Sequence, residues 1–133
     1  NMQSGDLHYD DLMLDISNFL RERCQKAISA GLSRNSIVVD PGIGFGKSYD
    51  DNCRIIRKLD ELKALGFPIL LGTSRKTFIG NVTGGDPQNR LEGTAATVVA
   101  SILNGCHIVR VHDVAFMRKV ADMTDAILHF GCP

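Results

Sequence analysis

The sequence lacks several features that would point to particular classes of protein. It has no apolar run near the ~20 residues that a membrane-spanning helix needs. Its formal net charge at pH 7 is +0, so no overall field attracts nucleic acid or a membrane surface. Nothing at its start is typical of a signal or transit peptide. We therefore expect a cytoplasmic protein whose partners are neither nucleic acids nor membranes.

The cysteines are poorly placed for a metal site or a disulfide framework. The four cysteines lie far apart and form no C-x-x-C pair: Cys24, Cys53, Cys106 and Cys132. This pattern indicates free thiols in a reducing compartment. A length of 133 residues with 44% hydrophobic content suits one domain, or part of a larger one. Because the chain begins at Asn1 and not at methionine, we expect a piece of a longer protein.

Two common phosphate-binding loops are also missing at the stretch that comes closest to them. Residues 37–47 run from three β-branched residues, through Asp40 and Pro41, into glycines at every second position. A G-x-x-x-x-G-K-[ST] loop would need glycine at Pro41, and a G-x-G-x-x-G loop would need it at Lys47. The pattern instead predicts a strand at residues 37–39, buried on both faces, that ends at a carboxylate beside a pliable loop.

Two interpretations of Asp40 are open at this point. A carboxylate accepts hydrogen bonds and repels phosphate, so Asp40 suits a neutral or cationic ring that is rich in donors. An aspartate in a turn between a strand and a helix can equally cap the helix that follows.

Apolar periodicity predicts helices and strands in alternation. The helices are expected at residues 10–30, 52–65, 88–104 and 114–130. The strands are expected at residues 37–39, 67–71 and 107–112. Asp50 or Asp51 is the predicted cap of the second helix and Asp113 that of the last, and small residues such as Gly93 let another element approach the third helix. Strands separated by helices must be parallel, so their carboxyl ends lie along one edge.

Polar side chains from all three predicted strands converge on that edge. Asp40 follows the first strand, the segment 74–76 (Ser-Arg-Lys) follows the second, and Arg110 with His112 ends the third. Ligands bind at this edge both in open α/β sheets and in (β/α)-barrels. A carboxylate for a donor-rich ring, a lysine for its acceptor edge and an Arg/His pair for an anion together predict a small-molecule site.

The cations also have structural interpretations. Arg75 and Lys76 are adjacent, which is common for a solvated pair in a loop. Arg110 and His112 share one face of their strand, and in a closed barrel that face is the interior. An unpaired arginine there is costly. An anionic ligand would neutralise the charge of Arg110. Alternatively, Arg110 would form a salt bridge with Asp113 or another acid.

Three motifs together resemble those of the dihydropteroate synthase family. They are DPGIGFGK at residues 40–47, SRKTFIG at 74–80 and RVHDV at 110–114. RLEGT at 90–94 and the residues at 1–3 and 8–11 are similar to further segments of that family. The resemblance covers essentially the whole chain, in order. It implies an α/β fold, a TIM (β/α)8 barrel, in which residues 1–133 are the C-terminal part of one pterin-binding domain, about strands 6–8 with helices 5–8.

The resemblance also implies a reaction of folate biosynthesis. In this family p-aminobenzoate displaces pyrophosphate from 6-hydroxymethyl-7,8-dihydropterin diphosphate, which gives 7,8-dihydropteroate. The matching positions imply pterin binding by Asp40 and Lys76, diphosphate binding by Arg110 and His112, and p-aminobenzoate binding by Phe45, Lys76 and Thr77. Thr77 stands where the family usually has serine.

The family further implies Mg²⁺ on the diphosphate, with its protein ligand outside this segment, and a homodimer formed through the late helices. No residue is assigned as acid or base, because an arylamine is neutral at pH 7 and the leaving group needs positioning and charge stabilisation. Three strands cannot close a barrel, so the 133 residues alone are expected to be inactive. Two alternatives remain: a pterin-binding methyltransferase-type domain, which has no diphosphate to hold, and a non-catalytic pterin-binding module.

Overall fold

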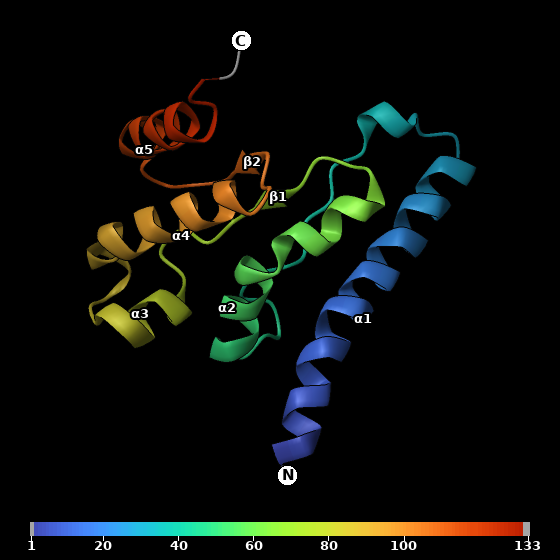
Figure 1. Ribbon diagram of the computed structural model, residues 1–133, viewed down its shortest axis with the longest axis horizontal. Helices are drawn as coiled ribbons and strands as arrows, with labels where there is room; N and C mark the ends of the chain where they lie inside the picture. Colours follow the sequence, from blue (N-terminus) through green and yellow to red (C-terminus); the bar gives the residue numbers. More distant parts are fainter. Residues whose placement is uncertain (1, 132–133) are drawn as a thin grey trace.

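The computed structural model describes residues 2–131, with the backbone alone for residues 2–11 (Figure 1). Its α-helices are α1 (Met2–Ser29), α2 (Tyr49–Arg57), α3 (Thr77–Thr83), α4 (Leu91–Leu103) and α5 (Val114–Leu128). Its 3-10 helices are η1 (Arg34–Ser36), η2 (Leu59–Leu65) and η3 (Pro87–Asn89). Its strands are β1 (Leu70–Leu71) and β2 (Ile108–Val109). Asn1 and Cys132 lie outside the described residues.

Three segments of the chain pair in parallel, as the sequence predicts. β1 lies beside β2 in the register Leu70–Ile108 and Leu71–Val109. Val39 forms a parallel bridge with Ile69, whose carbonyl accepts a hydrogen bond of 2.9 Å from the N–H of His107. Ile69 therefore lies between the other two segments, and all three run towards the same edge.

The first segment is shorter and more exposed than the sequence predicts. Val39 alone forms a bridge, and its side chain is 3% exposed, whereas that of Val38 is 45% exposed. The expected strand at residues 37–39, buried on both faces, is therefore wrong. Alternate residues of an extended segment point to opposite faces, so Val39 packs into the core while Val38 stays open to solvent.

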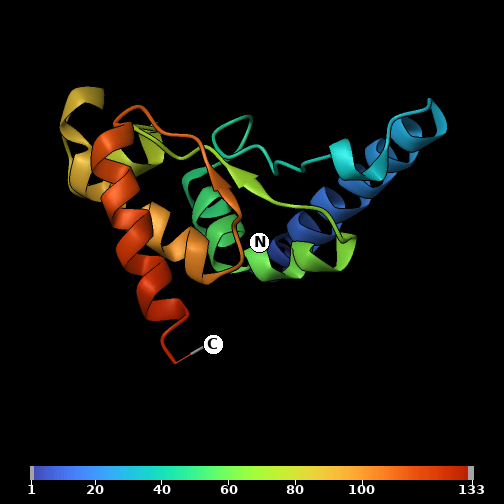
Figure 2. The same ribbon diagram turned by 90° about the horizontal axis from the view of Figure 1, so that it is seen from above.

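The described helices cover mainly one face of the paired segments. Figure 2 shows β1 and β2 along one side of the layer that α2, η2 and α4 form. Ile69 and Leu71 are buried on that side, among core residues of the helices that include Ile55, Leu59 and Leu62. On the other face Ile108 is 41% exposed. By alternation, Asp40 and Arg110 continue that open face at the carboxyl ends of their segments.

The helices follow the predicted order, with differences at their ends. The predicted helix at 52–65 is split into α2 and η2, and α2 is capped by Ser48, not by Asp50 or Asp51. Ser48 Oγ accepts a hydrogen bond of 3.1 Å from the N–H of Asp51, and the Asp51 carboxylate accepts one of 3.3 Å from the N–H of Ser48. Asp51 thus completes a reciprocal capping box. Asp40 does not cap α2 either.

One helix, α3, lies where the apolar periodicity predicts no element. It is short and contains Gly80 and the β-branched Val82 and Thr83, all poor helix formers. Asp113 occupies the predicted cap position of α5, but its side chain makes no capping hydrogen bond.

The structure also bears on two expectations, that the chain does not cross a membrane and that its cysteines are free thiols. No helix within residues 2–131 is both long and apolar enough to cross a bilayer. Cys24, Cys53 and Cys106 are free thiols, as the sequence predicts. Burial raises the pKa of the Cys106 thiol.

The close approach of α3 and α4 provides a test of the packing. A methyl group added at Gly93 would lie 2.2 Å from Ile79 Cγ2, and Ile79 is 3% exposed. Alanine normally favours a helix over glycine. We nevertheless expect Gly93→Ala to lower the free energy of unfolding by about 1–3 kcal/mol, as overpacking does.

Chemical denaturation would measure this change in both the wild-type and the Ile79→Ala backgrounds. The second background removes the clashing methyl group, so Gly93→Ala should cost less there. An equal cost in both backgrounds would contradict the proposed contact.

Candidate functional site

Three of the predicted site residues line one cavity at the strand ends. Lys76, Arg110 and His112 surround a space of about 350 Å³, and the remaining lining residues are Gly72, Ser74 and Val111. The guanidinium of Arg110 lies across Gly72, where an added methyl group would be 2.9 Å from Arg110 Nη2. Two cationic side chains and an imidazole around one space suit an anion with several oxygen atoms. We call this space the anion cavity.

The residues predicted for p-aminobenzoate line a second cavity of about 360 Å³. Phe45, Lys76 and Thr77 border it, together with Arg75 and Arg90 among others. The Lys76 ammonium lies 4.8 Å from the centre of the Phe45 ring, which is a cation–π contact. An exposed aromatic ring beside several cations suits a flat molecule that carries a negative charge. Lys76 lines both cavities and so joins them.

Asp40 lies in neither cavity. It borders a groove of about 320 Å³ against α1, with Ile16 and Phe19 among its neighbours. Its Oδ1 accepts a hydrogen bond of 2.8 Å from the N–H of Gly42, which closes a turn. Its negative charge still acts on Lys76, where it partly offsets the lowering of the pKa by burial and by Arg110. The structure thus brings Lys76, Arg110 and His112 together, whereas Asp40 lines a separate groove.

The charge on Lys76 is opposed by its surroundings. Burial is the main cause that lowers its pKa, the nearby Arg110 lowers it further, and Asp40 partly offsets both effects. The ammonium donates a hydrogen bond to the carbonyl of Ile43. A bound anion would favour the charged form of Lys76 and remove part of its repulsion from Arg110.

The glycine-rich loop at residues 42–46 packs against Lys76 through contacts that the sequence does not predict. Gly42, Gly44 and Gly46 have φ angles of 82°, 85° and 64°, which explains why glycine recurs at every second position. The side-chain oxygen of Asn52, a 4% exposed residue of α2, accepts a hydrogen bond of 2.9 Å from the N–H of Gly44. An added methyl group at Gly44 would lie 2.9 Å from Lys76 Cδ. No sequence spacing signals the contact of Asn52.

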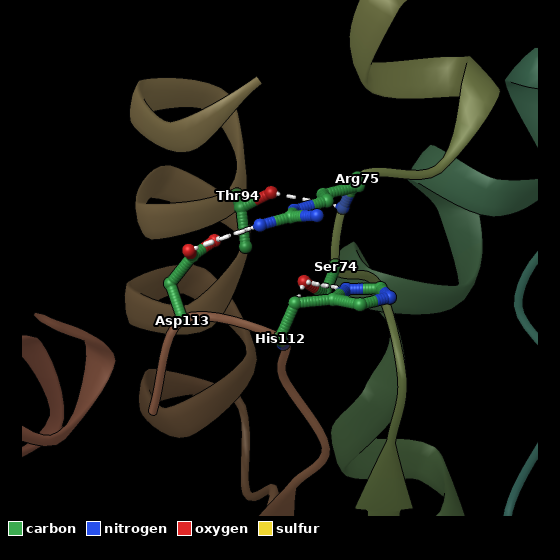
Figure 3. Close-up of polar contacts among 5 residues, drawn as sticks. All are labelled: Ser74, Arg75, Thr94, His112 and Asp113. Atoms are coloured by element: carbon green, nitrogen blue, oxygen red, sulfur yellow. Dashed lines mark hydrogen bonds and ion pairs between the residues drawn. The ribbon is translucent and has the colours of Figure 1, made fainter. Parts of the chain in front are cut away.

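Arg75, and not Arg110, forms an ion pair with Asp113. Its Nη2 lies 3.0 Å from an oxygen of Asp113, and both side chains are about two-thirds buried (Figure 3). The alternative in which Asp113 neutralises Arg110 is therefore wrong, because Asp113 pairs with Arg75. The interpretation of Arg75 as a solvated loop cation is wrong for the same reason.

The lining of the anion cavity does not fit a Mg²⁺ site. Mg²⁺ prefers carboxylate, carbonyl and water oxygens, whereas this cavity presents a lysine, an arginine and a histidine. Across the described residues, no group of three or more His, Cys, Asp and Glu side chains could hold a metal ion. A Mg²⁺ ion at this place would need oxygens of a bound anion and ligands from outside this chain.

Parallel strands with helices on one face, and polar side chains at their carboxyl ends, define a class of proteins that bind small molecules at this edge. The comparisons with known proteins make this class specific. Residues 1–112 match the family described as pterin binding enzyme. The chain belongs to this family of pterin-binding enzymes.

Several of its relatives are dihydropteroate synthases. That of Bacillus subtilis is 48% identical over 124 residues, which are 93% of this chain and 44% of the relative. A crystal structure of the Clostridium difficile enzyme in the presence of pteroic acid matches with a TM-score of 0.85 and 51% identity, over 87% of this chain and 44% of that one. The Thermus thermophilus enzyme in complex with 4-aminobenzoate matches with a TM-score of 0.83 and 38% identity, over 89% and 48%. The resemblance seen in the three motifs is confirmed, and this chain spans less than half the length of these relatives.

The lowered pKa of Lys76 predicts how the stability of the protein depends on pH. The folded state releases this proton at a lower pH than the unfolded state does. In the alkaline range the unfolded state therefore binds more protons, and this group makes the free energy of unfolding rise with pH. We expect the difference in unfolding free energy between wild type and Lys76→Met to shift in favour of wild type from about pH 7 to about pH 10.

Urea denaturation at a series of pH values would measure this difference, with Lys119→Met at an exposed position of α5 as the matched control. Comparing variants removes the opposite contribution of Cys106, whose raised pKa makes stability fall at high pH. A constant difference, or a shift towards the variant, would contradict the expectation.

Proposed function

We propose that this chain is part of a dihydropteroate synthase, which condenses p-aminobenzoate with 6-hydroxymethyl-7,8-dihydropterin diphosphate and releases pyrophosphate to give 7,8-dihydropteroate. The observation that carries the proposal is the anion cavity, where Lys76, Arg110 and His112 surround one space at the carboxyl ends of β1 and β2. The relatives whose structures were determined in the presence of pteroic acid and in complex with 4-aminobenzoate support it.

Each site residue has a role in this proposal. Arg110 and His112 bind the diphosphate, since a guanidinium and an imidazole both donate hydrogen bonds to phosphate oxygens. Lys76 lies between the two cavities and contacts the pterin as well as p-aminobenzoate, which packs beside Phe45 and Thr77. Asp40 accepts hydrogen bonds from the donor groups of the pterin. One oxygen of the Asp40 carboxylate already accepts a hydrogen bond from the N–H of Gly42.

Catalysis then depends on placement and charge. The arylamine nitrogen is a nucleophile at pH 7 without a base, so the residues must align it with the pterin methylene. The slow event is departure of the diphosphate, and Arg110, His112 and Lys76 stabilise its negative charge. Mg²⁺ would neutralise further charge on the diphosphate. No residue is assigned as an acid or a base in this proposal.

We further propose that residues 1–133 are the C-terminal portion of a single (β/α)8 barrel, about strands 6–8 with helices 5–8. The open face of the paired segments supports this placement. Val38 and Ile108 are apolar and 45% and 41% exposed, and the same face ends in Asp40 and Arg110. In a closed barrel these apolar residues would be covered by the remaining strands, and the polar ones would lie at its mouth.

The assembly that fits this chain is a homodimer in the cytoplasm. α5 exposes several apolar side chains, namely Val114, Phe116, Met123, Ile127 and Leu128, which are between 44% and 64% exposed. Phe116, Met123 and Ile127 lie on one face of the helix. A surface of this kind is typical of a protein interface. The free thiols fit a reducing compartment.

The barrel proposal predicts that the 133 residues alone do not turn over substrate. A chimaera that joins the amino-terminal half of the Bacillus subtilis relative to this chain should restore the reaction, because it supplies the missing strands. Release of pyrophosphate, followed with p-aminobenzoate and the dihydropterin diphosphate, measures both. Steady turnover by the 133 residues alone would contradict the barrel proposal, and an inactive but folded chimaera would contradict the proposed reaction.

Pyrophosphate binding separates the synthase from its alternatives. Arg110→Met should weaken binding of pyrophosphate to the chimaera roughly tenfold to a hundredfold, since a hydrogen bond to a charged group is worth about 1.5–3 kcal/mol. Arg118→Met is the matched control, because Arg118 pairs with Asp122 on the surface of α5. Titration calorimetry measures both.

Pterin binding without any competition from pyrophosphate would instead favour a methyltransferase-type domain. Binding of both ligands, with no product formed, would favour a non-catalytic module.

A further inference from the structure

Ser74 and His112 form a paired contact next to the anion cavity. The backbone N–H of His112 donates a hydrogen bond of 3.1 Å to Ser74 Oγ, and the same oxygen lies 2.7 Å from His112 Nδ1 (Figure 3). Ser74 is 6% exposed, so water does not compete freely for these contacts. The two residues come from segments 38 positions apart, at the ends of β1 and β2.

The positions of the hydrogen atoms follow from counting donors. A serine hydroxyl has one hydrogen and two lone pairs. The backbone N–H of His112 already uses one lone pair of Ser74 Oγ. Within the part of the chain whose side chains are described, the other contact of this oxygen is His112 Nδ1. The hydroxyl hydrogen is therefore available to Nδ1, and a neutral imidazole that accepts at Nδ1 carries its proton on Nε2.

The turn that holds Ser74 is fixed in a strained conformation. Arg75 has a φ of 60°, and it is the only described residue other than glycine with a positive φ. Its N–H donates to Thr94 Oγ1 over 3.1 Å, and its carbonyl accepts from Arg90 Nη1 over 2.8 Å. Its side chain pairs with Asp113, the residue after His112. A strained residue persists only when its surroundings hold it, and these contacts do so.

The strained turn therefore sets two side chains that face the anion cavity. Ser74, before Arg75, is held against the His112 ring, and Lys76, after it, is held against the glycine-rich loop. The ion pair of Arg75 with Asp113 joins the same two loops one residue away from the Ser74–His112 contact. The distance between the loops is thus fixed at two adjacent points.

We propose that Ser74 is a positioning residue, which orients the His112 imidazole and keeps its proton on Nε2. The Nε2–H group can then donate a hydrogen bond to an anion in the cavity. Ser74 does not itself bind the anion in this account. The proposal rests on the proposed function, in which that anion is the diphosphate of the dihydropterin substrate or the pyrophosphate that leaves.

Nitrogen-15 NMR of histidine-labelled chimaera tests the proton position without any ligand. The His112 signals are assigned by their loss in His112→Asn. We expect an unprotonated, hydrogen-bonded Nδ1 and a protonated Nε2 in the neutral ring. A protonated Nδ1 would overturn the proposal, because Ser74 would then accept both hydrogen bonds. This outcome does not depend on the proposed function.

Affinity for pyrophosphate tests the consequence. Ser74→Ala should weaken binding roughly threefold to tenfold, the range for loss of one hydrogen bond. Thr73→Val is the matched control, because it removes the hydroxyl of the adjacent buried residue, whose partner is Thr97 and not His112. Equal effects of the two variants would show a merely structural role and would overturn the proposal.

The two measurements also separate this proposal from the proposed function. A wild-type chimaera that fails to bind pyrophosphate contradicts the proposed function, while the NMR result still decides the state of His112. If Ser74→Ala does not fold, the NMR spectrum of the wild-type chimaera decides the proposal by itself.

Discussion

Parallel pairing around Ile69 is the constraint on which the rest of this structure depends. Ile69 is fully buried, it bridges to Val39 on one side, and its carbonyl accepts hydrogen bonds from the N–H groups of His107 and Ile108 on the other. Because the three segments run in the same direction, side chains that are up to 72 positions apart in the chain reach the same edge. Helices on one face leave the other face and its polar edge open to a ligand.

At that edge, charge is distributed unevenly. Asp113 neutralises Arg75, whereas Arg110 and Lys76 face the anion cavity and repel one another. Burial, and after it this repulsion, lower the pKa of Lys76. A site of this kind is complementary to an anion before the anion arrives, which is the condition for stabilising a charged leaving group.

The sequence predicts the alternation of elements and the polar strand ends well, because both depend on local periodicity and on the rule that crossover strands are parallel. It predicts less well whatever depends on contacts between distant residues. The length of the segment at Val39 depends on its neighbours, and the approach of Asn52 to the glycine-rich loop depends on how α2 packs. The partner of Asp113 is Arg75 and not Arg110 because of a strained turn that no pattern signals.

In the proposed function, Arg110 and His112 hold the departing anion at the shared edge of the strands. A crystal structure of the chimaera with bound pyrophosphate would test this role. We expect pyrophosphate oxygens within hydrogen-bonding distance of the Arg110 guanidinium and of His112 Nε2. Pyrophosphate bound elsewhere on the protein, with this cavity free of it, would rule out this role of the two residues.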